Sequence, residues 1–210
     1  MLTRTRTIIA CAAAAIALGS GTTAAFAATA TTWTVTPGRS FTAAIPTGSS
    51  TTFTDAVTHA TSTCGSSSLG GDLMSGSGLP GRGLGSVTTF SVSGCSPSIT
   101  ITTSGFPWLV NAASYNATTG VVSGRIKGIH IAYTGSTITG TCSGVVDGTS
   151  DTADNGTVPF RYNNATHRLR LVTGGNLHIY DNTCPGFGSG DPATFTGHYT
   201  VSPAQTITSP

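Results

Sequence analysis

The chain has 210 residues, of which only 8% are charged, and its formal net charge is +2 at pH 7. It contains no glutamate and a single lysine, Lys127, so it offers no basic patch for nucleic acid or for an anionic membrane, and we expect neither as a partner. Low charge together with abundant Thr, Ser and Gly favours short β-strands over exposed helices.

The first residues have the pattern of a secretory signal peptide. Arg4 and Arg6 precede an apolar run over 8–18, and the small-residue triplet at 25–27 follows. Roughly 20 apolar residues are needed to span a bilayer, so the run is too short for a permanent anchor. We therefore expect residues 1–27 to be removed and the protein to be secreted and extracellular.

Cleavage after residue 27 would leave residues 28–210 as a single β domain. The nine basic residues minus the two leader arginines leave seven, against seven Asp, so this part is formally neutral. No charged or proline-rich linker divides it, and its length is sufficient for one hydrophobic core.

The cysteines outside the predicted leader are expected to form two disulfides, because an oxidising exterior favours them. They are Cys64, Cys95, Cys142 and Cys184. Three pairings are formally possible, and we favour Cys64 with Cys95 and Cys142 with Cys184, since each pair then lies in its own half of the chain. A zinc site is the competing interpretation, but no C-x-x-C pair is present, and we predict no metal and no cofactor.

Apolar and polar residues alternate with a period of two in several segments, which is typical of half-buried antiparallel strands. These segments are 33–35, 87–92, 99–101, 129–133, 138–142, 177–180 and 195–201. Turn signals separate them, such as Asp147-Gly148 and Asn155-Gly156. The pattern predicts an all-β fold, an antiparallel β-sandwich with a closed β-barrel as the alternative. The Gly-Ser-rich stretch from Gly65 to Gly85 is expected to be a long loop.

A resemblance covers nearly all of the chain after the leader. The residues that carry it are Trp33, the turn at Gly38, Cys64, Val92 to Cys95, Pro107-Trp108, Gly120 to Gly128, Cys142, Cys184, Gly190-Asp191, Phe195, Tyr199 and Ser202-Pro203. In these turns, core aromatics and cysteines the chain resembles a group of uncharacterised secreted actinobacterial β-rich proteins with two disulfides. The resemblance implies an exported β domain and supplies no catalytic residue.

Hydrolysis is the main catalytic alternative. The chain has no G-x-S-x-G motif, and Gly188-Ser189-Gly190-Asp191 does not match the serine-protease signature, although a triad can assemble in space from distant residues. A glycosidase would need a pair of carboxylates, which here must be aspartates. Asp147, Asp151 and Asp154 cluster in a polar segment that is expected to be an exposed loop, where a raised pKa is hard to sustain.

Several residues could bind a ligand or a metal, and each also fits a structural role. The segment 151–156 could offer oxygens to calcium but lacks EF-hand spacing, and His178 with His198 could ligate a metal only if their strands were neighbours. Trp33 and Trp108 fit core positions and could also form platforms on which a ligand stacks. We expect a non-catalytic secreted protein, structural or binding a surface or ligand, with a secreted hydrolase (glycosidase or serine hydrolase) that uses Asp and His residues as the alternative.

Overall fold

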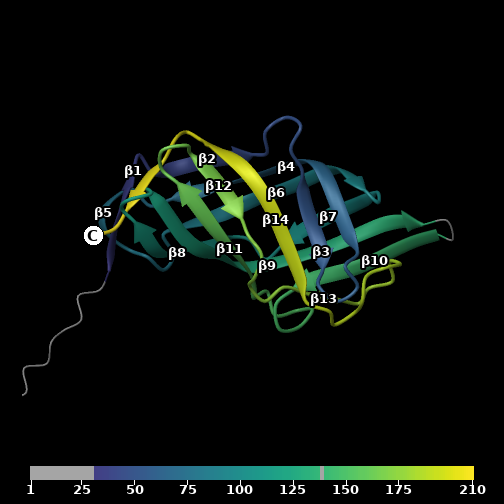
Figure 1. Ribbon diagram of the computed structural model, residues 1–210. Coiled ribbons are helices and arrows are strands. Elements are labelled where there is room, and N and C mark those ends of the chain that lie inside the picture. The colour runs from purple at the N-terminus through teal and green to yellow at the C-terminus, as the bar shows by residue number, and fades with distance from the viewer. Residues whose placement is uncertain (1–30, 138–139) are drawn as a thin grey trace, which may run out of the picture. The chain divides into compact units, whose positions relative to one another are not determined.

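The computed structural model describes residues 31–137 and 140–210, so the predicted leader lies outside the described residues (Figure 1). The described part is built from β-strands. They are β1 (Thr32–Thr36), β2 (Arg39–Ala44), β3 (Thr51–Asp55), β4 (Thr61–Leu73), β5 (Gly76–Pro80), β6 (Gly85–Ser96), β7 (Ile99–Ser104), β8 (Trp108–Asn116), β9 (Val121–Thr137), β10 (Gly140–Asp147), β11 (Gly156–Asn163), β12 (Arg168–Leu171), β13 (His178–Tyr180), β14 (Ala193–Ser202) and β15 (Thr206–Thr208). Within these residues, no helix is long and apolar enough to cross a membrane.

The strands pair antiparallel in a 12-stranded sheet and a 3-stranded sheet, β15-β1-β5. The large sheet runs β11-β12-β14-β2-β4-β6-β8-β9-β10-β13, with β3 between β14 and β4 and with β7 beside β9. Because β11 also pairs with β9, the strand order from β11 to β9 closes on itself. Such closure is a feature that the alternative prediction, a closed barrel, includes. The sheets pack face to face as an antiparallel sandwich, so the predicted fold class is confirmed.

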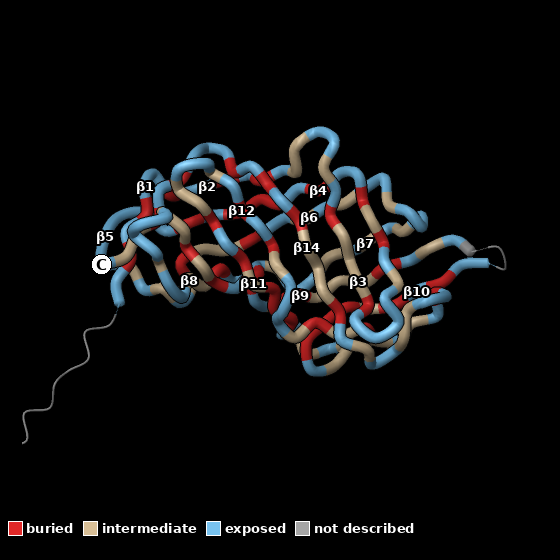
Figure 2. Tube along the Cα trace, in the orientation of Figure 1, coloured by how far each residue is buried: buried red, intermediate tan, exposed pale blue. Residues whose placement is uncertain are grey.

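Alternating burial along the strands explains why these segments form the core. In β1 the burial pattern is exposed-buried-exposed-buried-exposed, with Trp33 and Val35 inside, and β14 buries Tyr199 and Val201 in the same way (Figure 2). Period-two alternation puts one face of each strand against the core and the other in water.

Strand β9 connects two parts of the sandwich. Its first half, up to Ile129, pairs with β8 and β11, and its second half, from His130, pairs with β7 and β10. The change of partners therefore falls at His130, where the candidate polar site described below is found.

Both predicted disulfides are present. Cys64 is bonded to Cys95, its register partner on the neighbouring strand, and Cys142 is bonded to Cys184. The chain-entropy estimate for loops of this length is about 4 kcal/mol for each bond.

The predicted loop from Gly65 to Gly85 is wrong, because this stretch contains most of β4 and all of β5. Its small residues allow neighbouring strands to lie close together. A Cβ added at Gly71 would clash with the carbonyl oxygen of Ser86, at a bulge in the β4–β6 pairing. Glycine here is required by backbone contact within a sheet.

Candidate functional site

A cavity of about 230 Å³ lies inside the sandwich. Its walls come from strands of the 12-stranded sheet and from the segment around the second disulfide. The lining residues are Phe53, Ser62, Cys64, Leu69, Val87, Phe90, Val92, Pro97, Ser98, Ile99, Ile101, Trp108, Ile126, Ile129, Ile131, Tyr133, Gly135, Ser136, Cys142, Val146, Val158, Leu171, Leu177, Cys184, Pro185, Phe187 and Phe195. Almost all of them present carbon or sulfur, and neither Lys nor Arg nor His is among them.

Aromatic rings form one wall of the cavity. The Phe90 ring lies 5.7 Å from that of Trp108 and 5.6 Å, edge to face, from that of Phe195. The Trp108 indole is 3% exposed, and its Nε1 donates a hydrogen bond to the Ser104 carbonyl at 3.0 Å. With its single polar atom satisfied, the Trp108 ring presents an apolar surface to the cavity.

The two tryptophans therefore differ in position. Trp108 lines the cavity, where a ligand can contact it, whereas Trp33 is buried in another part of the core and does not line it. Alternation alone could not separate the two, since both are inward-facing strand residues.

Exposed lining residues identify the side on which the cavity opens. They are Pro97, Ser98, Ser136 and Pro185. Both disulfides also line the cavity, and Pro185 directly follows Cys184. The second disulfide thus joins the segment at the opening to β10.

A buried carboxylate holds the same segment from the other side. Asp55 is fully buried and accepts hydrogen bonds from the N–H groups of Val57 at 2.8 Å, Thr58 at 3.0 Å and Gly188 at 2.8 Å. Burial acts to raise the pKa of Asp55, but these hydrogen bonds outweigh it and the pKa is lowered. Asp55 therefore binds the segment beyond Phe187 as an anion.

Two buried polar side chains, Tyr133 and Ser62, belong to the lining, while the lining residues Ser98 and Ser136 are exposed at the opening. The Tyr133 hydroxyl donates to Asn182 Oδ1 at 2.7 Å, and burial, assisted by the charge of Asp55, raises its pKa to about 12. Ser62 is 1% exposed, and its hydroxyl has no hydrogen-bond partner among the described residues. A buried hydroxyl without a partner is uncommon in native proteins and calls for a reason.

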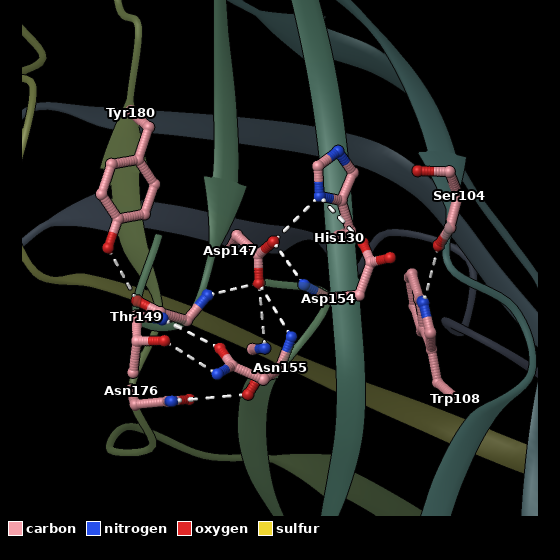
Figure 3. Close-up of polar contacts among 11 residues, drawn as sticks. Ser104, Trp108, His130, Asp147, Thr149, Asp154, Asn155, Asn176 and Tyr180 are labelled. Carbon is pink, nitrogen blue, oxygen red and sulfur yellow. Dashed lines mark hydrogen bonds and ion pairs between the residues drawn. The ribbon is translucent and has the colours of Figure 1, made fainter. Parts of the chain in front are cut away.

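A second group of polar residues lies outside the cavity, at the point where β9 changes partners. Ser104 on β7 is the register partner of His130 on β9, and Asp147 on β10 follows Val146, the register partner of Ile131. The three residues thus form a row across adjacent strands. In Figure 3, Asp147 and Ser104 lie on opposite sides of the His130 ring.

Asp147 accepts hydrogen bonds through both carboxylate oxygens. Its Oδ2 accepts from His130 Nδ1 at 2.9 Å and from the Asp154 N–H, and its Oδ1 accepts from the N–H groups of Gly148, Asn155 and Gly156 (Figure 3). Burial alone would raise the pKa of this carboxyl, but the bonds from His130 and the backbone lower it further than burial raises it. The prediction of an exposed aspartate loop is therefore wrong for Asp147, which is fully buried and organises the 148–156 segment around itself.

Three potential metal ligands meet here, since ligand atoms of His130, Asp147 and Asp154 lie within 4.8 Å of one another. The Asp154 Oδ1 is 3.2 Å from the same His130 nitrogen. Because Nδ1 and both oxygens of Asp147 already take part in hydrogen bonds, a cation would have to displace His130 or the loop backbone. The arrangement fits a positioned imidazole better than a metal centre.

The other candidate groups do not assemble as the sequence suggested. His178 Nδ1 contacts the carbonyl oxygens of Gly148 and Asn176, whereas His198 lies beside Arg170, its register partner on β12. The two histidines are thus on strands with different partners, and they share no site among the described residues.

Asp55 and Asp191 are two interacting carboxyls that no pattern in the sequence indicated. Burial, the charge of Asp55 and a hydrogen bond to Asp55 raise the pKa of Asp191. Glycosidase carboxyls stand about 5 to 9.5 Å apart so that a sugar or water fits between them. Asp55 is fully buried and both of its oxygens accept backbone N–H bonds, so it does not face a substrate and this pair does not fit glycoside hydrolysis.

Comparison with known proteins found no matching family model, no matching curated protein and no matching solved structure. The functional argument therefore rests on the geometry of the chain itself.

Proposed function

We propose that this chain is a secreted protein that binds a small, mainly apolar molecule in the interior cavity. The observation that carries the proposal is the cavity of about 230 Å³ with its apolar and aromatic lining. Ligand pockets are typically concave and apolar with few polar groups, and this cavity has that character.

The energetic cost of the cavity supports a binding role. Protein interiors are close-packed, and voids larger than a water molecule are few. At about 24 cal/mol per Å³, the contacts that fill a space of about 230 Å³ correspond to on the order of 5 kcal/mol. An apolar guest that fills the cavity supplies part of this contact free energy, which favours its binding.

Secretion is part of the proposal, supported by the leader pattern at 1–27 and by the two disulfides, which persist in oxidising compartments. The disulfides also suit a binding protein, because both line the cavity and one holds the segment at its opening. A preorganised site loses less conformational entropy on binding.

Blocking the cavity tests this function. Val92 is a half-buried lining residue, and Val92→Phe places a ring in the space. We expect the wild-type protein to bind propylbenzene with measurable heat in titration calorimetry, and Val92→Phe to weaken binding by about tenfold or more.

The matched control is Val172→Phe, a half-buried valine that does not line the cavity. It should bind propylbenzene as the wild type does. Absence of binding to the folded wild-type protein, or equal binding by Val92→Phe, would contradict the proposal.

A second candidate function, ester hydrolysis, is favoured by the row of Ser104, His130 and Asp147. The His130–Asp147 bond through Nδ1 leaves Nε2 for a nucleophile, as in serine hydrolases. Ser104 Oγ would bond to an ester carbonyl carbon, its proton would pass through His130 to the leaving alcohol, and water would then release the acid. This candidate ranks second because no hydrogen bond joins Ser104 to His130 in the described part of the chain.

A fluorophosphonate probe, which reacts with activated serines, distinguishes the two candidates. If the row is catalytic, the probe labels the wild-type protein, and Ser104→Ala abolishes the labelling. Thr102→Ala, which changes an exposed hydroxyl two residues earlier on β7, is the control and should retain it. An unlabelled folded wild-type protein would remove the hydrolase from consideration.

A further inference from the structure

We infer that the cavity selects a neutral ligand that carries one hydrogen-bonding group, such as an alcohol, and that Ser62 recognises this group. The inference rests on the proposed binding function and deepens it by naming the chemical class of the ligand.

The unpartnered hydroxyl of Ser62 is the first argument. Ser62 lies near the start of β4, lines the cavity and is 1% exposed, and its Oγ has no partner among the described residues. A buried hydroxyl gains when a guest supplies its missing hydrogen bond. Because a hydroxyl both donates and accepts, Ser62 can pair with an alcohol or with a carbonyl.

The charges around the cavity exclude an anionic ligand. The described lining contains no Lys, Arg or His to neutralise a carboxylate. Asp55, an anion with a lowered pKa, is close enough to raise the pKa of the lining residue Tyr133. A ligand carboxylate would be buried without a counter-ion and would be repelled by Asp55.

The volume limits the ligand to a small molecule. A cavity of about 150 Å³ holds benzene, so by proportion one of about 230 Å³ has room for roughly nine or ten non-hydrogen atoms. Phenylpropanol has this size, and its aromatic ring can pack against Trp108. Phenylpropanoate differs from it in charge, and propylbenzene lacks the polar group, so the three compounds form a matched series.

The experiment is calorimetric titration of the full mature chain and its Ser62→Ala variant with each compound. For the wild type we expect phenylpropanol to bind most tightly and phenylpropanoate to bind at least about tenfold more weakly at neutral pH. In Ser62→Ala, phenylpropanol binding should weaken by roughly three- to tenfold, while propylbenzene binding should change by less than about twofold.

Ser66→Ala, which removes an exposed hydroxyl from the same strand, is the control and should leave all three affinities unchanged. Ser62→Ala should fold, because it removes a hydroxyl that has no partner. If propylbenzene binds but Ser62→Ala leaves phenylpropanol binding intact, or if the wild type binds phenylpropanoate as tightly as phenylpropanol, the inference is overturned and the binding function survives. If no compound binds, the binding function itself fails.

Discussion

Replacing Asp147 by Asn is expected to lower the free energy of unfolding by about 3 kcal/mol, because a buried group with many hydrogen-bond donors around it loses its charge. The carboxylate accepts from His130 and from four backbone N–H groups, and it is fully buried. An asparagine keeps the shape but has one acceptor oxygen, and its amide group would face donors. Urea unfolding at neutral pH measures the loss.

The same variant has a distinct pH signature. The folded-state pKa of Asp147 is lowered, so the stability it contributes is present above its ordinary pKa, near 3.8, and is lost as the pH falls through the folded value. The difference in unfolding free energy between wild type and Asp147→Asn should therefore shrink as the pH falls well below about 4.

Asp151→Asn is the control, because Asp151 lies in the same polar segment but is only half-buried. It should change stability by less than about 0.5 kcal/mol. A wild-type-like Asp147→Asn variant would mean that the carboxylate does not organise the 148–156 segment.

Removing the second disulfide in the double variant Cys142→Ser, Cys184→Ser should lower the free energy of unfolding by about 4 kcal/mol. The bond closes a sequence separation of 42 residues, which restricts the unfolded chain. Both cysteines also line the cavity, so the variant that remains folded should bind propylbenzene more weakly than wild type.

Chemical unfolding monitored by tryptophan fluorescence measures the first effect and calorimetry the second. Ser143→Ala, an exposed neighbour on β10, controls for local disturbance and should resemble wild type in both. Unchanged stability and unchanged binding in the double variant would show that this disulfide supports neither the fold nor the cavity opening.

The fold class could be predicted because period-two alternation reflects a local property, the two faces of a strand. The alternation of Tyr199 and Val201 with polar residues on β14 is visible in the sequence. The favoured cysteine pairing, in which each pair lies in its own half of the chain, is also confirmed. The prediction failed between Gly65 and Gly85, because small residues mark loops and close strand contacts alike. Only the neighbouring strand, at Ser86, shows why Gly71 is needed.

The candidate sites could not be predicted from local patterns, because both depend on register. His130 and Asp147 meet only through the pairing of β9 with β10, and the sequence gives neither partner nor alignment. One signal for Asp147 was present, since an aspartate that ends a β-strand before glycine often binds backbone N–H groups. The cavity is lined by side chains from many strands, so no local pattern predicts it. Nothing in the sequence around Ser62 distinguishes it from the other serines.

The most direct test of ligand binding is a crystal structure of residues 28–210 in crystals soaked with propylbenzene. Our account predicts electron density for the guest in the interior cavity, in contact with the Trp108 ring and with the side chains around Phe90. A cavity filled by ordered water, or side chains that close the space and leave no density for the guest, would contradict it.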